Sequence, residues 1–536
     1  MALIAMENVG ELGIVKDFSP WQLPQNAWSD GNNVRVWQGS IEKILGYAEV
    51  MSSCPVAPYH VTFLQSGTNK YFIVGGLAKI YVHDGTSWTN ITRQSGGSDV
   101  DYSATAKEGW TSTLIGGVLV MTNGFDDPQF WALSSGVPST STKMDDLSNW
   151  PASTECKSLR AFRSFLIGLN ITESSVNYPR LVKWSTEAAT QAVPSSWDDT
   201  NATVDAGEIE LSMSTAPIVE GMPLRDTFMI YTEQETFSMT FVGTPFIFSF
   251  RMLSPSVGAM AKNCIAEFEG GHFIFGRSDF YLNSGDRITP LLPTKMRDYV
   301  FGFIDGEQTQ KSFVVSDAGR NEIWACFVSA DSTSNQVDKA VIWNHANNTF
   351  TIRDLPDLAH IGTGVIDNPN SFSTWTAATA TWATAEGPWA QSYDKYEDVL
   401  VFASPTNTKL YRDRSGNTED GTNMTSYIER TGLSLTSQGT PDQTTVKRIK
   451  AVWPKMHILN EDTVDFYVGT QMSTEEAVTW KGPFTFNPDS QSRVSCRASG
   501  KLYGIKIEST GNTSWELSGL EFELEDAGRR GSRAHT

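Results

Sequence analysis

The sequence predicts an all-β protein in which a β-propeller with insertions is followed by a C-terminal β-sandwich domain. Three observations lead to this prediction. Short apolar strands joined by turns that contain Gly, Asn or Asp recur along most of the 536-residue chain. The composition includes 17 Trp and 43 Gly, and apolar residues at helix-type heptad spacing are scarce. Toward the C-terminus, apolar and polar residues alternate strictly, as expected for strands with one wet face.

Residues 63–93 contain the clearest copy of the recurring unit. An apolar strand at Lys70–Val74 runs into the turn Gly75-Gly76, and a second strand at Ala78–His83 runs into the turn Asp84-Gly85. Gly-Gly and Asp-Gly between apolar runs are strong hairpin signals, because they supply backbone conformations that other residues resist. A sheet this small cannot bury its own face, so several copies are expected to stack on one another.

Looser copies of this unit follow at a spacing that suits propeller blades. The leading apolar strands of the successive copies centre near Phe72, Leu119, Phe165, Met229, Phe273, Trp324 and Leu400. These centres are 47, 46, 64, 44, 51 and 76 residues apart. A blade of four short strands takes roughly 40–50 residues, so four intervals fit or nearly fit and the two longest require insertions. The alternative that this pattern leaves open is an unrelated run of strands in a sandwich.

The patterns divide the chain into four parts. Residues 1–55 precede the first clear unit and are expected to form an N-terminal arm. Residues 56–425 are expected to form the propeller, with inserted loops and a short helix. Residues 426–527, where the strict alternation lies, are expected to form a separate β-sandwich. Residues 528–536 are a small basic tail.

Three segments of the propeller region depart from the strand pattern. Thr294–Ile304 places apolar residues at i, i+4 and i+7, with Thr294 as N-cap, and predicts a short helix. Asn368–Trp389 is rich in Thr, Ala, Ser and Trp and is interpreted as a loop or insertion. Arg412–Asn423 is polar and rich in turn residues, which indicates a domain boundary.

The charge balance is acidic. Lys and Arg number 41 against 61 Asp and Glu, so the net charge is −20, which argues against a protein that grips phosphate backbones by counterion release. The basic tail is the exception: Arg529 and Arg530 are candidates for contact with an acidic partner, the alternative being a solvated, disordered end.

Five scattered cysteines without a CxxC pair indicate reduced, mostly buried thiols. Glu7 and Glu11 interrupt the N-terminal apolar run, so neither a signal peptide nor a membrane span is expected.

A search for catalytic and metal-binding motifs finds little. The seven His are isolated, and no HExxH, GxSxG, P-loop or dinucleotide fingerprint occurs, so no cofactor, no metal and no enzymatic activity are expected. Two faint calcium-loop patterns begin at Asp199 and Asp413. However, Val204 and Thr418 stand where such a loop needs Gly.

The segment Val82–Trp88 resembles the Asp-box hairpin of sialidase-like propellers. In that turn the Asp side chain accepts hydrogen bonds from backbone N–H groups and the Trp packs beneath. The Asp-box is structural, so Asp84 and Trp88 are interpreted as residues of a stabilising hairpin turn. This resemblance keeps open an alternative function, that of a sialidase-like or glycan-binding propeller acting on host surface polysaccharide.

The N-terminal segment Gly10–Tyr47 resembles the opening of the tail nozzle proteins of short-tailed bacteriophages, also called tail tubular or phage stabilisation proteins. Further pieces occur in the same order along the chain. The resembling residues are Gly13, Asp17, Leu23-Pro24, Ala27–Gly31, Asn33–Arg35, Glu42-Lys43, Gly46, Arg160–Phe162, Asn170–Thr172, Pro194–Asp198, Asn321–Trp324, Trp343-Asn344, Thr349-Phe350, Val478–Pro483 and Ala527–Arg530.

The resemblance implies a virion protein whose work is assembly and passage of DNA. Six copies would form a ring at the distal end of the tail, whose channel retains and then passes genomic double-stranded DNA without reading its sequence. The ring would bind an adaptor ring, possibly with tail fibres or spikes, and meet the bacterial surface at ejection. The protein would be made in the host cytoplasm and end in the virion. Asn368–Trp389 and Arg412–Asn423 are the candidate gate loops, and an acidic wall suits such a conduit because attraction would stall a moving polyanion.

Overall fold

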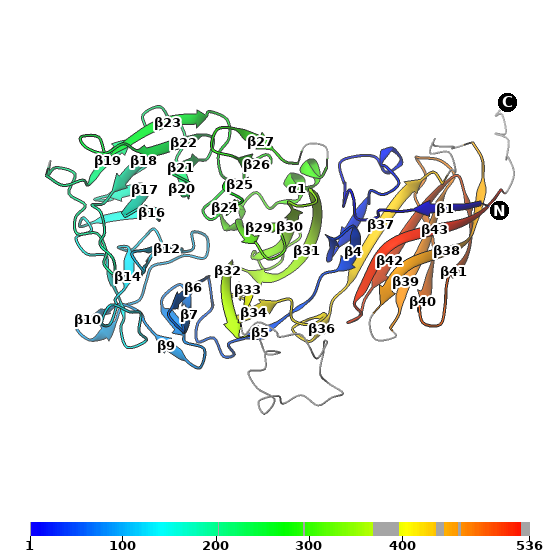
Figure 1. The fold of residues 1–536 in the computed structure, drawn as a ribbon, viewed down its shortest axis with the longest axis horizontal. Coiled ribbons are helices and arrows are strands. Elements are labelled where there is room, and N and C mark those ends of the chain that lie inside the picture. Colours follow the sequence, from blue (N-terminus) through cyan, green and yellow to red (C-terminus); the bar gives the residue numbers. More distant parts are fainter. Residues whose placement is uncertain are drawn as a thin grey trace. The chain divides into compact units, whose positions relative to one another are not determined.

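The structure is a computed structural model that describes residues 2–201, 203–292, 295–367, 396–435, 444–458 and 462–526. It confirms the predicted fold class: small antiparallel sheets typical of a β-propeller precede a β-sandwich (Figure 1). The chain forms two compact units. Unit 1 comprises Met1–Ala48, Cys264–Pro356 and Arg414–Thr536, and unit 2 comprises Glu49–Asn263 and Asp357–Asp413.

Unit 2 begins with four successive sheets of four strands, which we call blades 1 to 4. Blade 1 contains β6 (His60–Ser66), β7 (Asn69–Gly75), β8 (Ile80–His83) and β9 (Trp88–Asn90). Blade 2 contains β12 (Thr111–Ile115), β13 (Val118–Thr122), β14 (Gln129–Trp131) and β15 (Met144–Asp146). Blade 3 contains β16 (Thr154–Phe162), β17 (Phe165–Glu173), β18 (Val176–Trp184) and β19 (Gly207–Glu210). Blade 4 contains β20 (Ile218–Leu224), β21 (Thr227–Thr232), β22 (Thr236–Phe241) and β23 (Phe248–Ser254).

Between blades 1 and 2, β10 (Gln94–Ser95) and β11 (Ser98–Asp99) form a small ribbon. Blade 7, the last along the chain, also lies in unit 2 and contains β32 (His360–Asp367), β33 (Tyr396–Ser404) and β34 (Lys409–Asp413). Its fourth strand is β5 (Tyr47–Val50), which follows β34 in the strand order. Glu49 of β5 forms an ion pair with Lys409 of β34, at 3.0 Å. The last blade therefore takes one strand from the N-terminal region.

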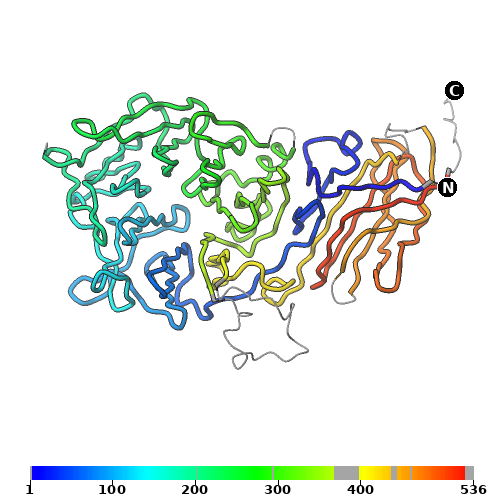
Figure 2. Tube along the Cα trace, viewed as in Figure 1, coloured from blue at the N-terminus to red at the C-terminus, as the bar shows by residue number. Residues whose placement is uncertain are grey.

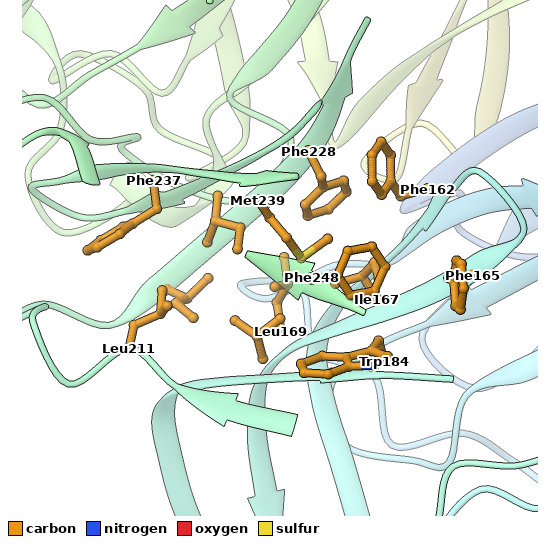
Figure 3. Packing of buried hydrophobic residues seen from close by; sticks show 13 residues of the cluster. Phe162, Phe165, Ile167, Leu169, Trp184, Leu211, Phe228, Phe237, Met239 and Phe248 are labelled. Atoms are coloured by element: carbon orange, nitrogen blue, oxygen red, sulfur yellow. The ribbon is translucent and has the colours of Figure 1, made fainter. Parts of the chain in front are cut away.

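Neighbouring blades bury their faces against one another. Between blades 3 and 4 lies an apolar cluster that Figure 3 shows in detail; it includes Phe162, Phe165, Ile167, Leu169, Trp184, Leu211, Phe228, Phe237, Met239 and Phe248. Further clusters join blade 1 to blade 2, blade 2 to blade 3, and blade 7 to blade 1. This stacking is the arrangement that sheets too small to bury their own faces require.

Unit 1 contains blades 5 and 6. Blade 5 consists of β24 (Ile265–Phe268), β25 (Gly271–Phe275), β26 (Phe280–Asn283) and β27 (Ile288–Pro290). Blade 6 consists of β28 (Phe313–Asp317), β29 (Glu322–Phe327), β30 (Val337–Asn344) and β31 (Thr349–Leu358). Short 3-10 helices occur at η1 (Pro20–Gln22) and η2 (Thr309–Lys311).

The predicted short helix is present as α1 (Arg297–Phe303), with Val300 buried. Thr294, the expected N-cap, lies outside the described residues. The side chain of Asp17 satisfies the helix start instead, because its two oxygens accept hydrogen bonds from the backbone N–H groups of Asp298 and Tyr299 at 3.1 and 3.2 Å. A cap that lies far away in the sequence leaves no local signal.

The sandwich of unit 1 is built from two sheets. The first has the order β3 (Val34–Trp37), β4 (Ser40–Lys43), β43 (Trp515–Asp526), β38 (Lys447–Ile458) and β41 (Val494–Gly500), with β1 (Ala2–Met6) also on β43. The second has the order β2 (Asp30–Asn32), β37 (Ser426–Leu433), β42 (Leu502–Ser509), β39 (Val464–Gln471) and β40 (Thr479–Phe486). Their alternating apolar residues, among them Phe466, Ile505 and Phe522, are buried.

The N-terminal residues, which the sequence analysis assigns to an arm, contribute strands to both sandwich sheets. β1 pairs with β43, β2 with β37, and β4 with β43. Figure 2 shows the blue N-terminal trace running beside the red strand of the sandwich. The N-terminal strands have three to five residues each, too few to display a period. β37 and β43, with which β1, β2 and β4 pair, lie several hundred residues away in the sequence.

The polar segment Arg412–Asn423 contains the end of β34 and a small ribbon, β35 (Thr418–Glu419) and β36 (Thr422–Asn423). Glu419 pairs in parallel with Tyr47. The predicted insertion Asn368–Trp389 lies outside the described residues. No helix among the described residues is long and apolar enough to cross a membrane.

Candidate functional site

The first strands of the blades in unit 2 bring polar side chains together in a central network. His60 comes from β6, Ser112 from β12, Arg160 from β16, Glu220 from β20 and His360 from β32. Contacts between β12 and β16, β16 and β20, and β32 and β6 bring these strands close to one another. Side chains alternate along a strand, so apolar neighbours such as those in the blade clusters fill the space between blades while these polar groups meet.

Glu220 is the most enclosed member of the central network, with no exposed surface. Its Oε1 accepts from Ser158 Oγ at 2.6 Å, Gly221 N at 2.9 Å and Arg160 Nε at 3.1 Å. Its Oε2 accepts from Arg160 Nη2 at 2.7 Å and Asn263 N at 3.1 Å. Burial alone would raise the pKa of Glu220, but the Arg160 guanidinium and these hydrogen bonds outweigh it and lower the pKa below its ordinary value.

Arg160 extends the network in two further directions. Its Nη1 donates to the backbone oxygen of Ser112 at 2.8 Å, and its Nη2 donates to Asn263 Oδ1 at 2.9 Å. Nearby, the ammonium group of buried Lys262 lies 3.5 Å from Glu108 Oε2. Burial lowers the pKa of Lys262 from its ordinary value, and the Glu108 carboxylate opposes that shift.

Two histidines occupy the contact between blade 1 and blade 7. The ring centroids of His60 and His360 are 4.2 Å apart. His60 Nε2 lies 3.0 Å from Ser112 Oγ, and His360 Nδ1 accepts from the backbone N–H of Val61 at 3.5 Å. Burial, with the nearby positive charge of Arg160, lowers the pKa of His360 to about 4 and the pKa of His60 well below its usual range. Both rings are therefore neutral at pH 7.

The central network is suited to holding strands together. Both oxygens of Glu220 already accept hydrogen bonds from protein donors, so this carboxylate is saturated rather than poised to take a proton from a substrate. The buried hydrogen bonds between Arg160 and Glu220 fix the arrangement of β16 and β20, the strands that supply these two residues. The sequence names Arg160 among the resembling residues but does not predict the network, because the partners of Arg160 come from separate blades.

The N-terminal resemblance residues form a second cluster, which we call the junction, in unit 1. Trp28 Nε1 donates to the backbone oxygen of Val9 at 2.8 Å. Asn33 Nδ2 donates to the backbone oxygen of Thr425 at 2.8 Å, and Asn33 Oδ1 accepts from the backbone N–H of Asp354 at 2.9 Å. Asn33 thus links the sandwich to β31 of blade 6.

Arg35 is the charged centre of the junction. Its guanidinium lies 3.2 Å from Glu42 Oε1 and 3.1 Å from Glu322 Oε1, and its side chain is only 7% exposed. Glu322 belongs to β29 of blade 6. Burial raises the pKa of Glu42, an effect that Arg35 opposes. Lys43 Nζ donates to the backbone oxygen of Gly511 at 2.7 Å. The resembling residues therefore hold sandwich strands to one another and to blade 6.

The predicted hairpin turn lies between β8 and β9. Asp84 Oδ1 accepts from the backbone N–H groups of Thr86 and Ser87, both at 2.9 Å, and from Thr86 Oγ1 at 2.6 Å. These hydrogen bonds lower the pKa of Asp84. Trp88 Nε1 donates to the backbone oxygen of Ser52 at 3.3 Å, and its ring meets His83 edge-on at 4.9 Å. Both residues make contacts that stabilise the turn.

The remaining candidates from the sequence are the basic tail and the calcium-loop patterns. Arg529 and Arg530 lie outside the described residues. At the first calcium-loop pattern, Asn201 Oδ1 accepts from the backbone N–H of Thr203 at 3.0 Å, so it serves the turn itself. Among the described residues, no group of three or more His, Cys, Asp and Glu side chains is arranged to hold a metal ion.

Blade 3 carries an acid-lined cavity with a volume of about 620 Å³. At its wall, Lys183 Nζ lies 2.5 Å from Glu208 Oε2, 3.3 Å from Asp199 Oδ1 and 3.6 Å from Glu173 Oε1. The lining residues are Asn149, Pro151, Ala152, Thr154, Glu173, Ser174, Lys183, Ser195, Ser196, Trp197, Asp198, Asp199 and Glu208. The sequence analysis names Pro194–Asp198 and Asp199 for other reasons, but it does not predict a cavity, because the remaining lining residues come from separate strands and loops.

Comparison with known proteins gives distant structural neighbours. No protein-family model and no curated protein matches the chain. PorZ, described as an essential bacterial surface component of the type-IX secretion system of Porphyromonas gingivalis, is similar at 9% identity and a TM-score of 0.38, covering 88% of this chain and 60% of its own. The AfRom2 CNH domain is similar at 8% identity and a TM-score of 0.31, covering 69% of this chain and 97% of its own. An exo-beta-1,3-galactanase from Phanerochaete chrysosporium is similar at 8% identity and a TM-score of 0.25, covering 90% of this chain and 100% of its own.

This chain thus spans 60% of the length of the PorZ chain. The TM-scores are 0.38 or lower and the identities are 8–9%. The functions of these neighbours therefore say nothing about the function of this protein.

Proposed function

We propose that this protein is a structural component of a phage virion, the distal tail nozzle of a short-tailed bacteriophage. In this role, copies of the chain assemble into a ring, expected to be a hexamer, that retains genomic double-stranded DNA and passes it during ejection. The ring would bind an adaptor ring and possibly tail fibres or spikes, and it would meet the bacterial surface when DNA leaves.

The observation that carries the proposal is the ordered set of resembling residues in the N-terminal segment. Three of these residues make long-range contacts in this fold. Asn33 and Arg35 bind the sandwich to blade 6 through a hydrogen bond and an ion pair, and Asp17 caps α1. A motif whose members each make a long-range contact is harder to match by chance than a run of exposed residues.

The net charge of −20 supports the same proposal. An acidic protein repels a polyanion, so DNA would slide past its surface rather than bind to it. The hydrogen-bonded Glu220 carboxylate and the buried thiols also fit a structural role. The five cysteines are buried, and burial raises the pKa of Cys156 to about 12.

Electron microscopy of the purified full-length chain, alone and with tail components, tests this proposal. A six-fold ring with a central hole is the expected result. A monodisperse, compact monomer that joins no tail particle would contradict it.

A second candidate is a glycan-binding propeller, and the acid-lined cavity of blade 3 favours it. Carboxylates and Asn149 offer hydrogen bonds to sugar hydroxyls there, and Trp197 lies in its wall. Release of reducing sugar from host polysaccharide, lost on Asp199→Asn and kept on substitution of exposed Glu210, would support an enzyme instead of a nozzle.

A further inference from the structure

Blade 7 meets blade 1 through a close backbone contact, which we call the seam (β6 and β32, Figure 1). Gly362 of β32 lies so near β6 that a Cβ atom on it would be 2.7 Å from the backbone oxygen of Val61. Beside this contact, the His60 and His360 rings touch, with centroids 4.2 Å apart. The seam therefore places two titratable rings where the last blade closes against the first.

The hydrogen bonds at the seam require neutral rings. His360 Nδ1 is an acceptor for the Val61 N–H, so the neutral ring carries its proton on Nε2. Protonation would place a second N–H on Nδ1, facing the Val61 N–H, and this hydrogen bond would be lost. Buried His60 Nδ1 has no hydrogen-bond partner among the described residues, so a proton added there would remain unsatisfied.

Among the described residues, the charges that act on His60 do not stabilise its protonated form. Arg160 of β16 and Lys262, which precedes blade 5, are both cationic and act on His60. The carboxylates of this region are already engaged, Glu220 by Arg160 and Glu108 by Lys262. The paired neighbours on the adjacent strands, Gly75 opposite His60 on β7 and Ala403 opposite His360 on β33, carry no charge, and neither does Ser112 on β12.

We propose that the seam is an acid-sensitive closure, in which protonation of the His60–His360 pair loosens the packing of blade 7 against blade 1. Two adjacent imidazolium ions would repel each other and Arg160 at short range in an enclosed site. Blades 3 and 4, which are joined by an apolar cluster without histidine, would stay packed under the same conditions. This inference is independent of the proposed function.

Hydrogen exchange of the full-length protein at pH 7.5 and pH 5.0, corrected for the intrinsic pH dependence of amide exchange, tests the proposal. With the pKa of His360 at about 4 in the closed state and 6.5 in the open state, the open population should rise about 30-fold at pH 5.0. Faster exchange confined to β6 and β32 is the expected result. Equal acceleration in β16 and β20, or no acceleration at the seam, would overturn the proposal.

Variants separate the histidines from other acid effects. His360→Asn keeps an acceptor near the position of Nδ1, and His60→Gln keeps a polar group near the position of Nε2. The double variant should lose the seam-specific acceleration between the two pH values, whereas His457→Gln, which replaces an exposed histidine of the sandwich, should retain it. An unchanged acceleration in the double variant would refute the role of the pair. If the double variant does not fold, the wild-type exchange pattern alone still decides the question.

Discussion

Replacing Glu220 by Gln should destabilise unit 2 by about 3–5 kcal/mol. Both oxygens of this carboxylate only accept hydrogen bonds, three at Oε1 and two at Oε2. An amide nitrogen at either position would face N–H donors, so at least two hydrogen bonds are lost together with the charge that balances Arg160. Two hydrogen bonds to a charged group at about 1.5–3 kcal/mol each give about 3–6 kcal/mol, and the usual cost of breaking a buried ion pair, about 3–5 kcal/mol, narrows this to the stated range.

The assay should report on unit 2 by itself, because a chain with two compact units need not unfold in a single transition. Hydrogen exchange in a series of urea concentrations gives the opening free energy of β16 and β20 directly. The matched control is Glu210→Gln, which breaks another Arg–Glu pair of blade 3. Its bond to Arg180 is 2.6 Å long, but the two side chains are 35% and 46% exposed, so we expect a loss below about 1 kcal/mol. Equal losses in the two variants would refute the reasoning that burial makes the Glu220 pair important.

Four further predictions each depend on one contact or one titratable group. Arg35→Met should destabilise unit 1 by about 3 kcal/mol, because it leaves buried Glu322 without its guanidinium; chemical denaturation measures this, and a change below about 1 kcal/mol would contradict it. Asp84→Ala should cost only about 1 kcal/mol, since it removes the acceptor of a partly exposed turn, and thermal unfolding should show a small shift without loss of fold. Gly46→Ala should cost about 1–3 kcal/mol or more, because its Cβ atom would meet a backbone oxygen at 1.9 Å; wild-type stability of this variant would be inconsistent with the structure. Stability should also fall with acid through His360: its pKa is lower in the folded state, so the unfolded chain binds more protons, and about 3 kcal/mol present above pH 6.5 is lost as the pH falls toward 4, which urea titrations at several pH values can detect.

The sequence predicted the seven blades, but the strand predicted to lead each blade is in fact its second strand. All seven predicted strand centres fall in the second strand of a blade, as with Leu119 in β13, Phe273 in β25 and Trp324 in β29. In these three strands every residue is buried, so the second strand gives the strongest apolar signal. The first strand carries the polar residues of the central network, such as His60 and Glu220, and its signal is weaker for that reason.

The contacts of the central network and the junction could not be predicted from the sequence, because their partners lie far apart along the chain. Arg160 and Glu220 are separated by 60 residues and by a blade boundary, and Asn33 meets Asp354 across 321 residues. Local periodicity and turn chemistry describe a strand and its neighbour, whereas these contacts depend on which blades and sheets come together. The Asp84 turn was visible because all of its partners lie within three residues.

The oligomeric state of the full-length protein tests the central proposal most directly. We predict that electron microscopy of the purified chain with its tail partners will show a six-fold ring with an open centre, in which every copy contributes a propeller and a sandwich. A compact monomer that binds or cleaves host polysaccharide and never enters a tail particle would contradict the account.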